Sequence, residues 1–479
     1  MLLASMAGAG QEYDVAVIGG GLGGMTAAKR LADAGRSVLL VEGYSRLGGY
    51  ATWFKRRGHI FDVALHAFPY GMAKTLRKYW SKELAARVVP LRRIRFDNPE
   101  FSFTTTFETA DFQRILREEF GVPDARTEAF FAACRNMDFY GGSGETTREF
   151  LERLFPGRLD VMRVLLETVT YATGTNLDDP AMVYAIVFSN FAQKGTCTFS
   201  GGTDYLLAEM QRLLLESGVD ILLRTKVDGI EVANGRAAGI SAAGRSVSAR
   251  AVVSNANLKE TCLGLMDMES ACPPFAGEVQ AVPLSVSVAQ VYMGVRPGEA
   301  IPEIADILFS SREPRYDAAA LTIFPPRSIS YSFYYPHHVR PDYGGTEIVA
   351  SMCADYADWE GLPEEEYEKK KETLTRTVLD DLSRYIPAIR TKLDHVEAAT
   401  PRTLERFTGH WRGASFGTKF PGFVAAEKLP GIVKGLYHCG SQGILMSGWL
   451  GSANSGALTA GKVDAFLDGE GTDRNTRRA

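Results

Sequence analysis

Three glycines are the first residues of this sequence whose type and spacing could support chemistry. Gly19, Gly21 and Gly24 form a GxGxxG pattern, directly after an apolar run and directly before a run with helical spacing. In such a loop the first glycine permits a tight turn, and the second lets the backbone approach a pyrophosphate. The third allows the helix to pack closely on the strand. The spacing therefore predicts a dinucleotide-binding loop.

An acidic residue follows the loop at the distance that a dinucleotide site requires. Glu42 ends the next apolar run, about 20 positions beyond the glycines. A carboxylate at this point can accept hydrogen bonds from ribose hydroxyls and would repel a 2′-phosphate. We therefore expect FAD or NAD here rather than NADP.

Further glycine-rich segments favour FAD over NAD. After Glu42 the chain continues through Arg46 and the pair Gly48 and Gly49, which we expect to extend the phosphate cradle. A second glycine-rich junction between a strand and a helix lies at 435–461, where a helix N-terminus can face the flavin. Each segment alone could also be a surface turn or loop, but together they predict FAD as the cofactor.

A βαβ unit must position these residues. Apolar strands are predicted at 13–18 and 37–42, with a helix between them. Similar elements recur much later, as a helix at 205–216 and strands at 220–223, 249–256 and 435–440. We therefore predict an α/β fold with a discontinuous Rossmann-type FAD-binding domain, assembled from residues 12–60, 201–264 and 402–468.

The two stretches between these segments have a different character. Residues 61–200 and 265–401 are richer in aromatic residues and contain amphipathic helical runs. They predict an inserted α+β substrate domain that faces a membrane. The polar end of the chain, 469–479, predicts a disordered tail.

Composition narrows the classes of function. The chain has 479 residues, of which 45% are hydrophobic, and its net charge is only -4, so we expect no nucleic-acid partner. Its six cysteines show no CxxC pair and no histidine spacing typical of zinc, so we expect no metal and a reducing, cytoplasmic location. No segment has the length and uniform apolarity of a membrane-spanning helix.

Four longer motifs have counterparts in known flavoproteins. DVAVIGGGLGGMTAAKRLADAGRSVLLVEGYSRLGG is shared with the wider amine-oxidase-like flavoproteins. GGTDYLLAEMQRLLLESGVDILLRTKVDGI, AVVSNANLKET and TPRTLERFTGHWRGASFG are more specific. With these motifs the chain resembles, nearly from end to end, the phytoene desaturase, carotenoid isomerase and retinol saturase family. The resemblance implies that the Val227 backbone lies at the adenine of FAD, and that Gly440 and Ser441 approach the ribityl chain. Ser441 stands where relatives commonly carry an acidic residue.

The same resemblance implies a class of reaction. It suggests an FAD-dependent oxidoreductase that desaturates, isomerises or saturates C=C bonds of a carotenoid or another polyisoprenoid. Two alternatives stay open: a flavin amine oxidase, which shares the N-terminal motif, and a non-catalytic prenyl- or lipid-binding escort protein of related fold. The electron acceptor is not indicated by the sequence.

Three residues are candidates for acid–base or charge-stabilising work beside a flavin. His66 follows the cofactor segment closely and could remove a proton during desaturation, although a hydrogen-bonded structural histidine is the alternative. His410 and Arg412 lie in the FTGHWRGASFG segment, for which the alternative is a loop packed on the flavin edge.

A basic stretch from Lys74 to Arg95 points to a membrane surface. It contains eight basic residues and one acidic residue, with apolar and aromatic residues between them. Cationic attraction and an apolar face would together favour peripheral docking on the inner face of a membrane, where an insoluble substrate could enter. A solvated helix face is the alternative.

Overall fold

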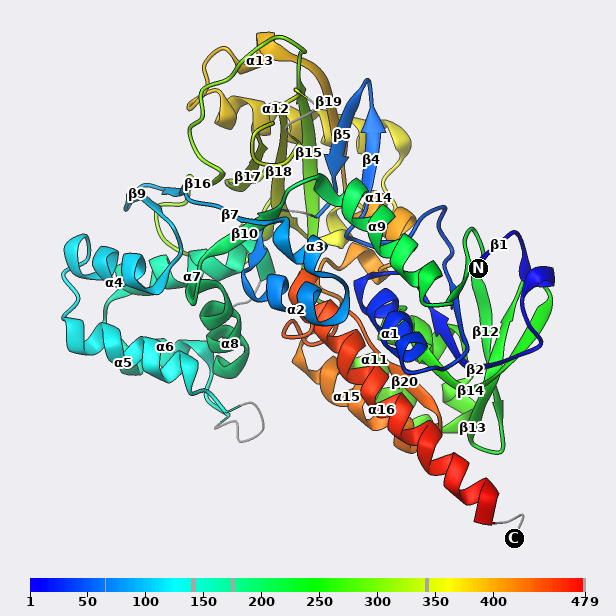
Figure 1. Cartoon of the computed structure of the whole chain (residues 1–479). Helices are drawn as coiled ribbons and strands as arrows, with labels where there is room; N and C mark the ends of the chain where they lie inside the picture. Colours follow the sequence, from blue (N-terminus) through cyan, green and yellow to red (C-terminus); the bar gives the residue numbers. More distant parts are fainter. Residues whose placement is uncertain (65, 139–143, 174–176, 341–343, 477–479) are drawn as a thin grey trace.

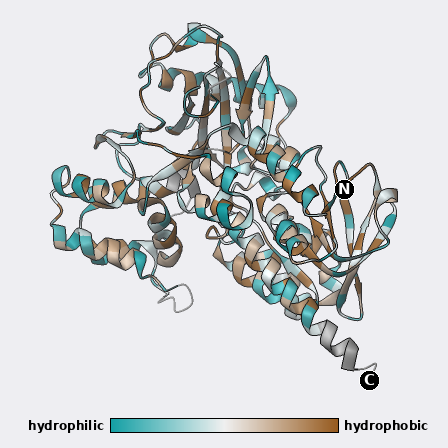
Figure 2. Ribbon diagram, in the orientation of Figure 1, coloured by the Kyte–Doolittle hydropathy of each residue, from teal (hydrophilic) through white to brown (hydrophobic). Residues whose placement is uncertain are grey.

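The computed structural model describes all residues except 65, 139–143, 174–176, 341–343 and 477–479 (Figure 1). Two large sheets and a helical lobe make up the described chain. Figure 2 shows mostly hydrophobic strands in the middle of the molecule and many hydrophilic residues on the outer helices, as expected for layered domains.

The first sheet has eight strands and contains the predicted βαβ unit. Its order is β1-β11-β3-β2-β14-β13-β12, and β20 pairs with β14. Six strands (β1, β11, β3, β2, β14 and β20) run parallel, whereas β12 and β13 extend the sheet in antiparallel fashion. The bounds are β1 Leu2–Leu3, β2 Glu12–Ile18, β3 Val38–Val41, β11 Asp220–Leu222, β12 Val227–Ala233, β13 Arg236–Ala242, β14 Arg245–Ser254 and β20 Leu436–His438. The prediction of an α/β, Rossmann-type fold built from separated stretches is confirmed.

Helices cover both faces of this sheet. Val15 and Val17 of β2 belong to the core shared with α1, α9 and α16, whereas Ala16 and Ile18 face the core shared with α11 and α15. Because both faces are buried, the central strands are continuous apolar runs. The helix bounds are α1 Leu22–Asp33, α9 Gly202–Glu216, α11 Pro273–Ala281, α15 Phe420–Ile432 and α16 Gly448–Thr476.

The second sheet forms the wall of the other half of the molecule. Its seven strands have the order β19-β15-β18-β17-β16-β8-β9 and are antiparallel, apart from the parallel pair β8 and β16. The bounds are β8 Ile94–Asp97, β9 Ser102–Thr105, β15 Ser287–Val295, β16 Ile307–Ser311, β17 Ser328–Tyr334, β18 Glu347–Ala354 and β19 Leu393–Ala399.

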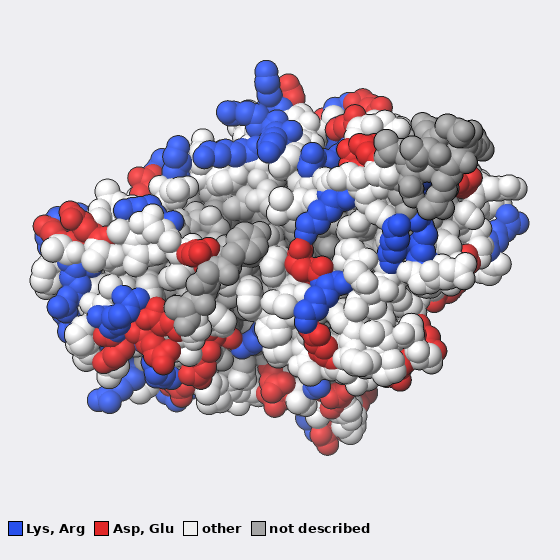
Figure 3. All heavy atoms as spheres, turned by 90° about the horizontal axis from the view of Figure 1, so that it is seen from below, with Lys and Arg blue, Asp and Glu red and all other residues white. Residues whose placement is uncertain are grey.

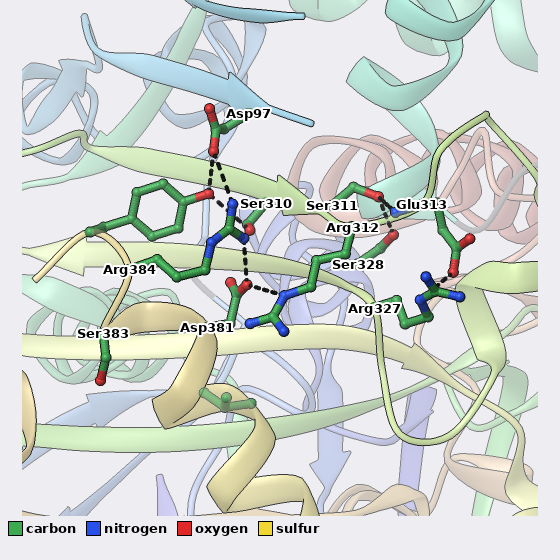
Figure 4. Close-up of polar contacts among 12 residues, drawn as sticks. Asp97, Ser310, Ser311, Arg312, Glu313, Arg327, Ser328, Asp381, Ser383 and Arg384 are labelled. Atoms are coloured by element: carbon green, nitrogen blue, oxygen red, sulfur yellow. Dashed lines mark hydrogen bonds and ion pairs between the residues drawn. The ribbon is translucent and has the colours of Figure 1, made fainter. Parts of the chain in front are cut away.

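Helix α12 (Glu364–Leu382) packs on this sheet and is fastened to it by a buried carboxylate. Asp381 accepts hydrogen bonds from Arg312 (3.0 Å), Arg384 (2.9 Å) and the Tyr331 hydroxyl (3.1 Å), as Figure 4 shows in part. The pairing neutralises a carboxylate that would be costly to bury alone. The far side of the sheet is therefore rigidly closed, and its other face is left to form a site.

The remaining elements form a helical lobe and short connecting strands. The lobe has a core of phenylalanines, among them Phe112, Phe130, Phe150 and Phe188. Its helices are α4 Thr109–Glu118, α5 Asp124–Arg135, α6 Thr147–Leu154, α7 Leu159–Thr173 and α8 Ala181–Ala192. The connecting elements are β4 Trp53–Arg56, β5 His59–Asp62, β6 Phe68–Pro69, α2 Gly71–Tyr79, α3 Lys82–Ala86, β7 Val88–Pro90, β10 Thr196–Phe199, α10 Met268–Ala271, α13 Ile389–Lys392 and α14 Pro401–Thr408.

Of the predicted disordered tail at 469–479, residues 469–476 are helical, and 477–479 lie outside the described residues. Helix α16 continues as far as Thr476. Arg36 binds both Asp464 and Asp468 of this helix, which anchors its last core-facing turns. Because each added residue of a formed helix gains a backbone hydrogen bond, the helix extends beyond its core contacts. Polar composition does not reveal such an anchor.

The basic stretch at 74–95 does not expose the apolar residues that the sequence suggests for bilayer insertion. Its exposed basic side chains are Lys74, Arg77, Lys78, Lys82 and Arg92. Its buried apolar side chains include Leu76, Trp80 and Leu84. The apolar face of this segment packs into the core beneath the first sheet, as the apolar face of an amphipathic helix usually does. Within the described residues, no helix combines the length and apolarity needed to cross a bilayer.

A buried histidine joins the β4–β5 hairpin to the second sheet. His59 lies 3.1 Å from Glu347 of β18 through Nδ1 and 2.7 Å from Asp394 of β19 through Nε2. Both ring nitrogens therefore donate to carboxylates, which requires the imidazolium form. The hydrogen bonds to Glu347 and Asp394 raise the pKa of His59 above its ordinary value of 6.5.

We predict that this contact makes stability depend on pH. The folded-state pKa is raised, so the stabilisation by His59 is complete below 6.5 and is lost as the pH rises through the higher folded value. His59→Gln should lower the free energy of unfolding at pH 6 by about 3–5 kcal/mol, since it removes the buried imidazolium that pairs with Glu347 and Asp394. The difference should shrink by pH 9 in urea denaturation. His337→Gln, at a half-exposed side chain, is the control. An equal loss from His59→Gln at both pH values would contradict the prediction.

Candidate functional site

The predicted glycine loop connects β2 to α1 with little room for side chains. Gly19 has a φ of +91°, a region that favours glycine, and a Cβ on Gly24 would collide with the carbonyl oxygen of Gly19. Gly21 is the N-cap of α1 and makes no side-chain cap. The first N–H groups of α1 therefore remain available to an anion, as a pyrophosphate site requires.

Glu42 stands directly beside this loop, at the end of β3. Its two carboxylate oxygens accept hydrogen bonds from the N–H groups of Gly20 and Tyr44, each at 2.7 Å. Burial raises the pKa of Glu42, and these hydrogen bonds oppose that rise. A carboxylate has about four acceptor positions, so lone pairs remain for ribose hydroxyls. The geometry fits the role that the sequence suggests.

Of the three residues predicted to extend the phosphate cradle, two line the cavity and one does not. Gly48 donates its N–H to the carbonyl oxygen of Gly20 (2.8 Å), and Gly48 and Gly49 line the cavity. Arg46 does not line it. Its guanidinium lies 4.4 Å from the Trp53 ring centroid and donates to the Trp53 carbonyl oxygen (2.9 Å). This cation–π contact directs Arg46 away from the phosphate cradle, contrary to the prediction.

Residues from the two later stretches of the predicted FAD-binding domain lie at the same end of the cavity as the glycine loop. Val227, at the start of β12, lines the cavity, as does Ser441, whose hydroxyl lies 3.3 Å from that of Ser452. Gly440 packs behind them, with a φ of +97° and its N–H bonded to Ser455 (3.1 Å). It therefore shapes the wall without facing the cavity.

Asn255 is a site residue that sequence reasoning missed. It follows β14 and contacts the glycine loop, with Nδ2 3.5 Å from the Gly19 carbonyl oxygen. A Cβ on Gly21 or Gly23 would lie within 2.7 Å of its side-chain amide. Its position directly after a parallel strand was the available signal, since ligands bind at the carboxyl ends of such strands.

His66 lines the cavity but has both ring nitrogens engaged. The Tyr292 hydroxyl donates to Gln290 Oε1 (2.6 Å), and the two N–H groups of the Gln290 amide donate to the Val63 carbonyl oxygen (2.9 Å) and to Ser351 Oγ (3.0 Å). The Ser351 hydroxyl in turn donates to His66 Nε2 (3.1 Å). His66 Nε2 therefore accepts, and Nδ1–H donates to Ser332 Oγ (3.1 Å). Burial lowers the pKa of His66 to about 4, so the ring is neutral near pH 7 and has no free nitrogen for substrate.

His410 differs from His66 in having one nitrogen left. Its Nδ1–H donates to the carbonyl oxygen of Ala414 (3.0 Å), so Nε2 keeps its lone pair, and among the described residues it has no hydrogen-bond partner. The ring lines the cavity, and its centroid lies 4.8 Å from the centroid of the Tyr50 ring. Burial lowers the pKa of His410 to about 4.

Arg412 is directed away from the large cavity. Its guanidinium lies 3.4 Å from the Glu360 carboxylate and stacks over the Tyr356 ring. The half-exposed guanidinium is therefore not a catalytic candidate, and the sequence expectation for Arg412 is wrong.

One continuous cavity of about 1100 Å³ is lined by the glycine loop, Glu42, Val227, His66 and His410. It extends from the glycine loop, Glu42 and Val227 to the second sheet and the helical lobe. Its volume exceeds the usual range for a single small ligand, so it has room for a dinucleotide and a second molecule. No cluster of three or more potential metal ligands occurs among the described residues.

We predict that Glu42 contributes to affinity for FAD. Glu42→Gln replaces a carboxylate oxygen that accepts a backbone N–H by an amide that cannot, and it weakens the acceptors left for ribose. The dissociation constant of FAD, measured by quenching of flavin fluorescence on addition to apoprotein, should rise roughly ten-fold. Glu12→Gln, at the exposed start of β2, should leave it unchanged. Equal affinities for the two variants would refute this role.

Known proteins are similar in sequence to this chain. The chain matches the family described as "Flavin containing amine oxidoreductase" over residues 22–442. The chloroplastic prolycopene isomerase of Daucus carota is 23% identical over 514 residues, which cover 96% of this chain and 81% of that protein. The all-trans-retinol 13,14-reductase of Danio rerio is 22% identical over 531 residues, covering 95% and 86%.

A solved structure shows the same fold. The crystal structure of an oxidoreductase from Methanosarcina mazei superposes with a TM-score of 0.65, at 19% identity, over 94% of this chain and 99% of that chain. The glycine loop and Glu42 fit a dinucleotide site, and the family match over most of the chain points to the same kind of cofactor. This chain belongs to the flavin containing amine oxidoreductase family and is an FAD-dependent oxidoreductase.

Proposed function

We propose that the protein acts on C=C bonds of a carotenoid or another polyisoprenoid. The cavity carries this proposal, because it continues from the cofactor end to a wall of aromatic and aliphatic side chains. These are Ile94, Phe107, Ile186, Phe191, Ile307 and Phe309. Such a wall suits a long apolar ligand. Relatives named for prolycopene and all-trans-retinol support the same substrate class.

Bound FAD would supply hydride and electron transfer. The chain must orient the polyene, exclude water and accept the proton that the substrate releases. We assign the last task to His410 rather than to His66. His410 Nε2 keeps a lone pair, whereas both nitrogens of His66 are bonded to protein partners. Desaturation needs such a proton acceptor, and a net cis–trans isomerisation does not.

An amine substrate fits this cavity less well. Among its described lining residues the acids are Glu42, Glu260 and Glu405. Glu260 accepts the Trp411 indole N–H (3.2 Å), and Glu405 accepts the Tyr356 hydroxyl. None of the three belongs to the apolar wall, so an ammonium bound there would be a buried charge without a partner.

A direct assay tests the proposed substrate class. FAD-loaded protein is incubated anaerobically with matched cis and all-trans polyenes, and the products are followed by chromatography and mass spectrometry. We expect loss or gain of two hydrogens for desaturation or saturation, or unchanged mass with altered retention for isomerisation. Peroxide release from amines in air, with no change in any polyene, would favour an amine oxidase. Prenyl binding without flavin would favour an escort protein.

Paired variants separate the two histidines in the same assay. His410→Gln should slow a desaturation roughly 10²-fold or more, the usual contribution of a positioned base, while FAD binding is retained. His66→Gln should change the rate less, since its ring has no free nitrogen. The reverse ranking would exclude the assignment to His410.

We also propose that the protein docks peripherally on an anionic membrane through α2. Lys74, Arg77 and Lys78 of this helix are exposed and, among the described residues, form no ion pair. Tyr79, at its end, lines the cavity, and so does Leu458 of α16, which is 56% exposed. Seen from below, Lys and Arg side chains gather along one edge of the molecule (Figure 3). A basic rim beside a cavity margin would guide an insoluble substrate inward.

Charge reversal on α2 tests this docking. Lys74→Glu/Lys78→Glu should weaken binding to vesicles containing anionic lipid by roughly 30-fold or more, since each basic residue near the surface contributes about 1 kcal/mol. Co-sedimentation measures the bound fraction. Lys369→Glu/Lys428→Glu, at exposed positions of α12 and α15, is the matched control. Equal losses for the two double variants would argue against a specific docking helix.

A further inference from the structure

The segment that carries His410 is a tight turn with little freedom of its own. It begins after Gly409, whose φ is +69°, and the N–H of Gly413 donates to the carbonyl oxygen of His410 (2.9 Å). A Cβ on Gly413 would lie 2.5 Å from the carbonyl oxygen of Pro401 and 2.8 Å from Ser287 Oγ. Only glycine fits such a close approach, so the position of the turn depends on what holds the Gly413 backbone.

Two hydroxyl groups hold the carbonyl oxygen of Gly413. The Tyr50 hydroxyl donates to it at 2.9 Å, and the Ser287 hydroxyl donates to it at 2.7 Å. A carbonyl oxygen has two lone pairs, so both are occupied. Tyr50 directly follows the glycine pair of the predicted cofactor cradle, whereas Ser287 opens β15 of the second sheet. The turn is therefore tied to both halves of the molecule.

Tyr50 also touches the imidazole that the turn presents. The centroid of its ring lies 4.8 Å from the centroid of the His410 ring, and the two planes are inclined by 85°, an edge-to-face arrangement. The His410 ring is held at a second point, because its Nδ1–H donates to the carbonyl oxygen of Ala414 (3.0 Å), the residue after Gly413. Tyr50 therefore contacts both the backbone anchor of the turn and the ring itself.

These contacts give Tyr50 a task in the proposed reaction. We propose that Tyr50 is a positioning residue, which keeps the Nδ1–H of His410 on the Ala414 carbonyl oxygen and so leaves the Nε2 lone pair unbonded. The inference rests on the proposed function, in which His410 accepts the proton of a desaturation.

Ser287 separates this role from a direct contact of Tyr50 with the ligand. Tyr50 lines the large cavity, so its ring could act on a bound molecule without His410. Ser287 holds the same carbonyl oxygen but, among the described residues, is not one of those that line the large cavity. An effect that both residues share must therefore run through the turn.

The state of the His410 ring tests the inference directly. The histidines of FAD-loaded protein are labelled with ¹⁵N, and the His410 signals are assigned with His410→Gln. The wild-type ring should be almost entirely the Nδ1–H tautomer. Tyr50→Leu removes the hydroxyl and the ring contact, and it should lower the ratio of the Nδ1–H form to the Nε2–H form roughly ten-fold. Tyr50→Phe keeps the ring contact and should lower this ratio less.

Two further variants show whether the effect runs through the turn. Ser287→Ala releases the other hydrogen bond to the Gly413 carbonyl oxygen, and it should lower the tautomer ratio about as much as Tyr50→Phe does. Tyr205→Leu is the matched control, since this tyrosine lies on α9 and is 38% exposed. It should leave the ratio unchanged.

Kinetics extend the test to turnover. With a polyene that the protein desaturates, Tyr50→Phe should lower kcat roughly three-fold or more at unchanged KM. Added to His410→Gln, it should lower kcat no further, because the effects of a residue that acts through another are not additive with it. Equal losses in the two backgrounds would show that Tyr50 acts on the ligand itself, which would refute the positioning role.

The outcomes separate this inference from the function it rests on. An unchanged tautomer ratio in Tyr50→Leu and Ser287→Ala would overturn the positioning role and leave the polyene function standing. A wild-type His410 ring that populates both tautomers equally would do the same. If no polyene is converted, the proposed function fails, and the tautomer ratio still decides whether Tyr50 holds the His410 ring.

Discussion

Backbone-to-backbone packing at the start of α1 holds the site together. A Cβ on Gly23 would lie 2.9 Å from the Cα of Gly440, and one on Gly456 would collide with the carbonyl of Gly23. These glycines come from opposite ends of the chain, and only residues without side chains let the segments approach so closely. The dinucleotide loop, the distant glycine junction and α16 therefore form one packing unit, to which the second sheet adds a substrate wall.

The features fixed by local chemistry could be predicted from the sequence. The GxGxxG spacing and the acid at Glu42 follow from the turn, the helix start and the ribose contact, all within one βαβ unit. The errors concern contacts between distant residues. Arg36 pairs with Asp468 near the end of α16, and Leu76 is buried in the core beneath the first sheet. Neither contact leaves a mark in local composition.

The hydrogen bonds of the site show the same difference between local features and contacts of distant residues. The sequence favoured His66 over His410, but the partners of their ring nitrogens reverse that order: Ser351 and Ser332 engage both nitrogens of His66, whereas Ala414 engages one nitrogen of His410. What the sequence could not supply was the identity of each hydrogen-bond partner, and that identity decides which group can meet a substrate.

The central claim is that one cavity holds FAD and, beside it, an apolar polyene. A crystal structure of the protein with FAD and a non-reactive polyene analogue tests it most directly. The account predicts the pyrophosphate at the start of α1 and the polyene chain along the wall formed by Phe191 and Phe309. A dinucleotide elsewhere, or a polyene bound outside this cavity with the apolar wall filled by water, would contradict it.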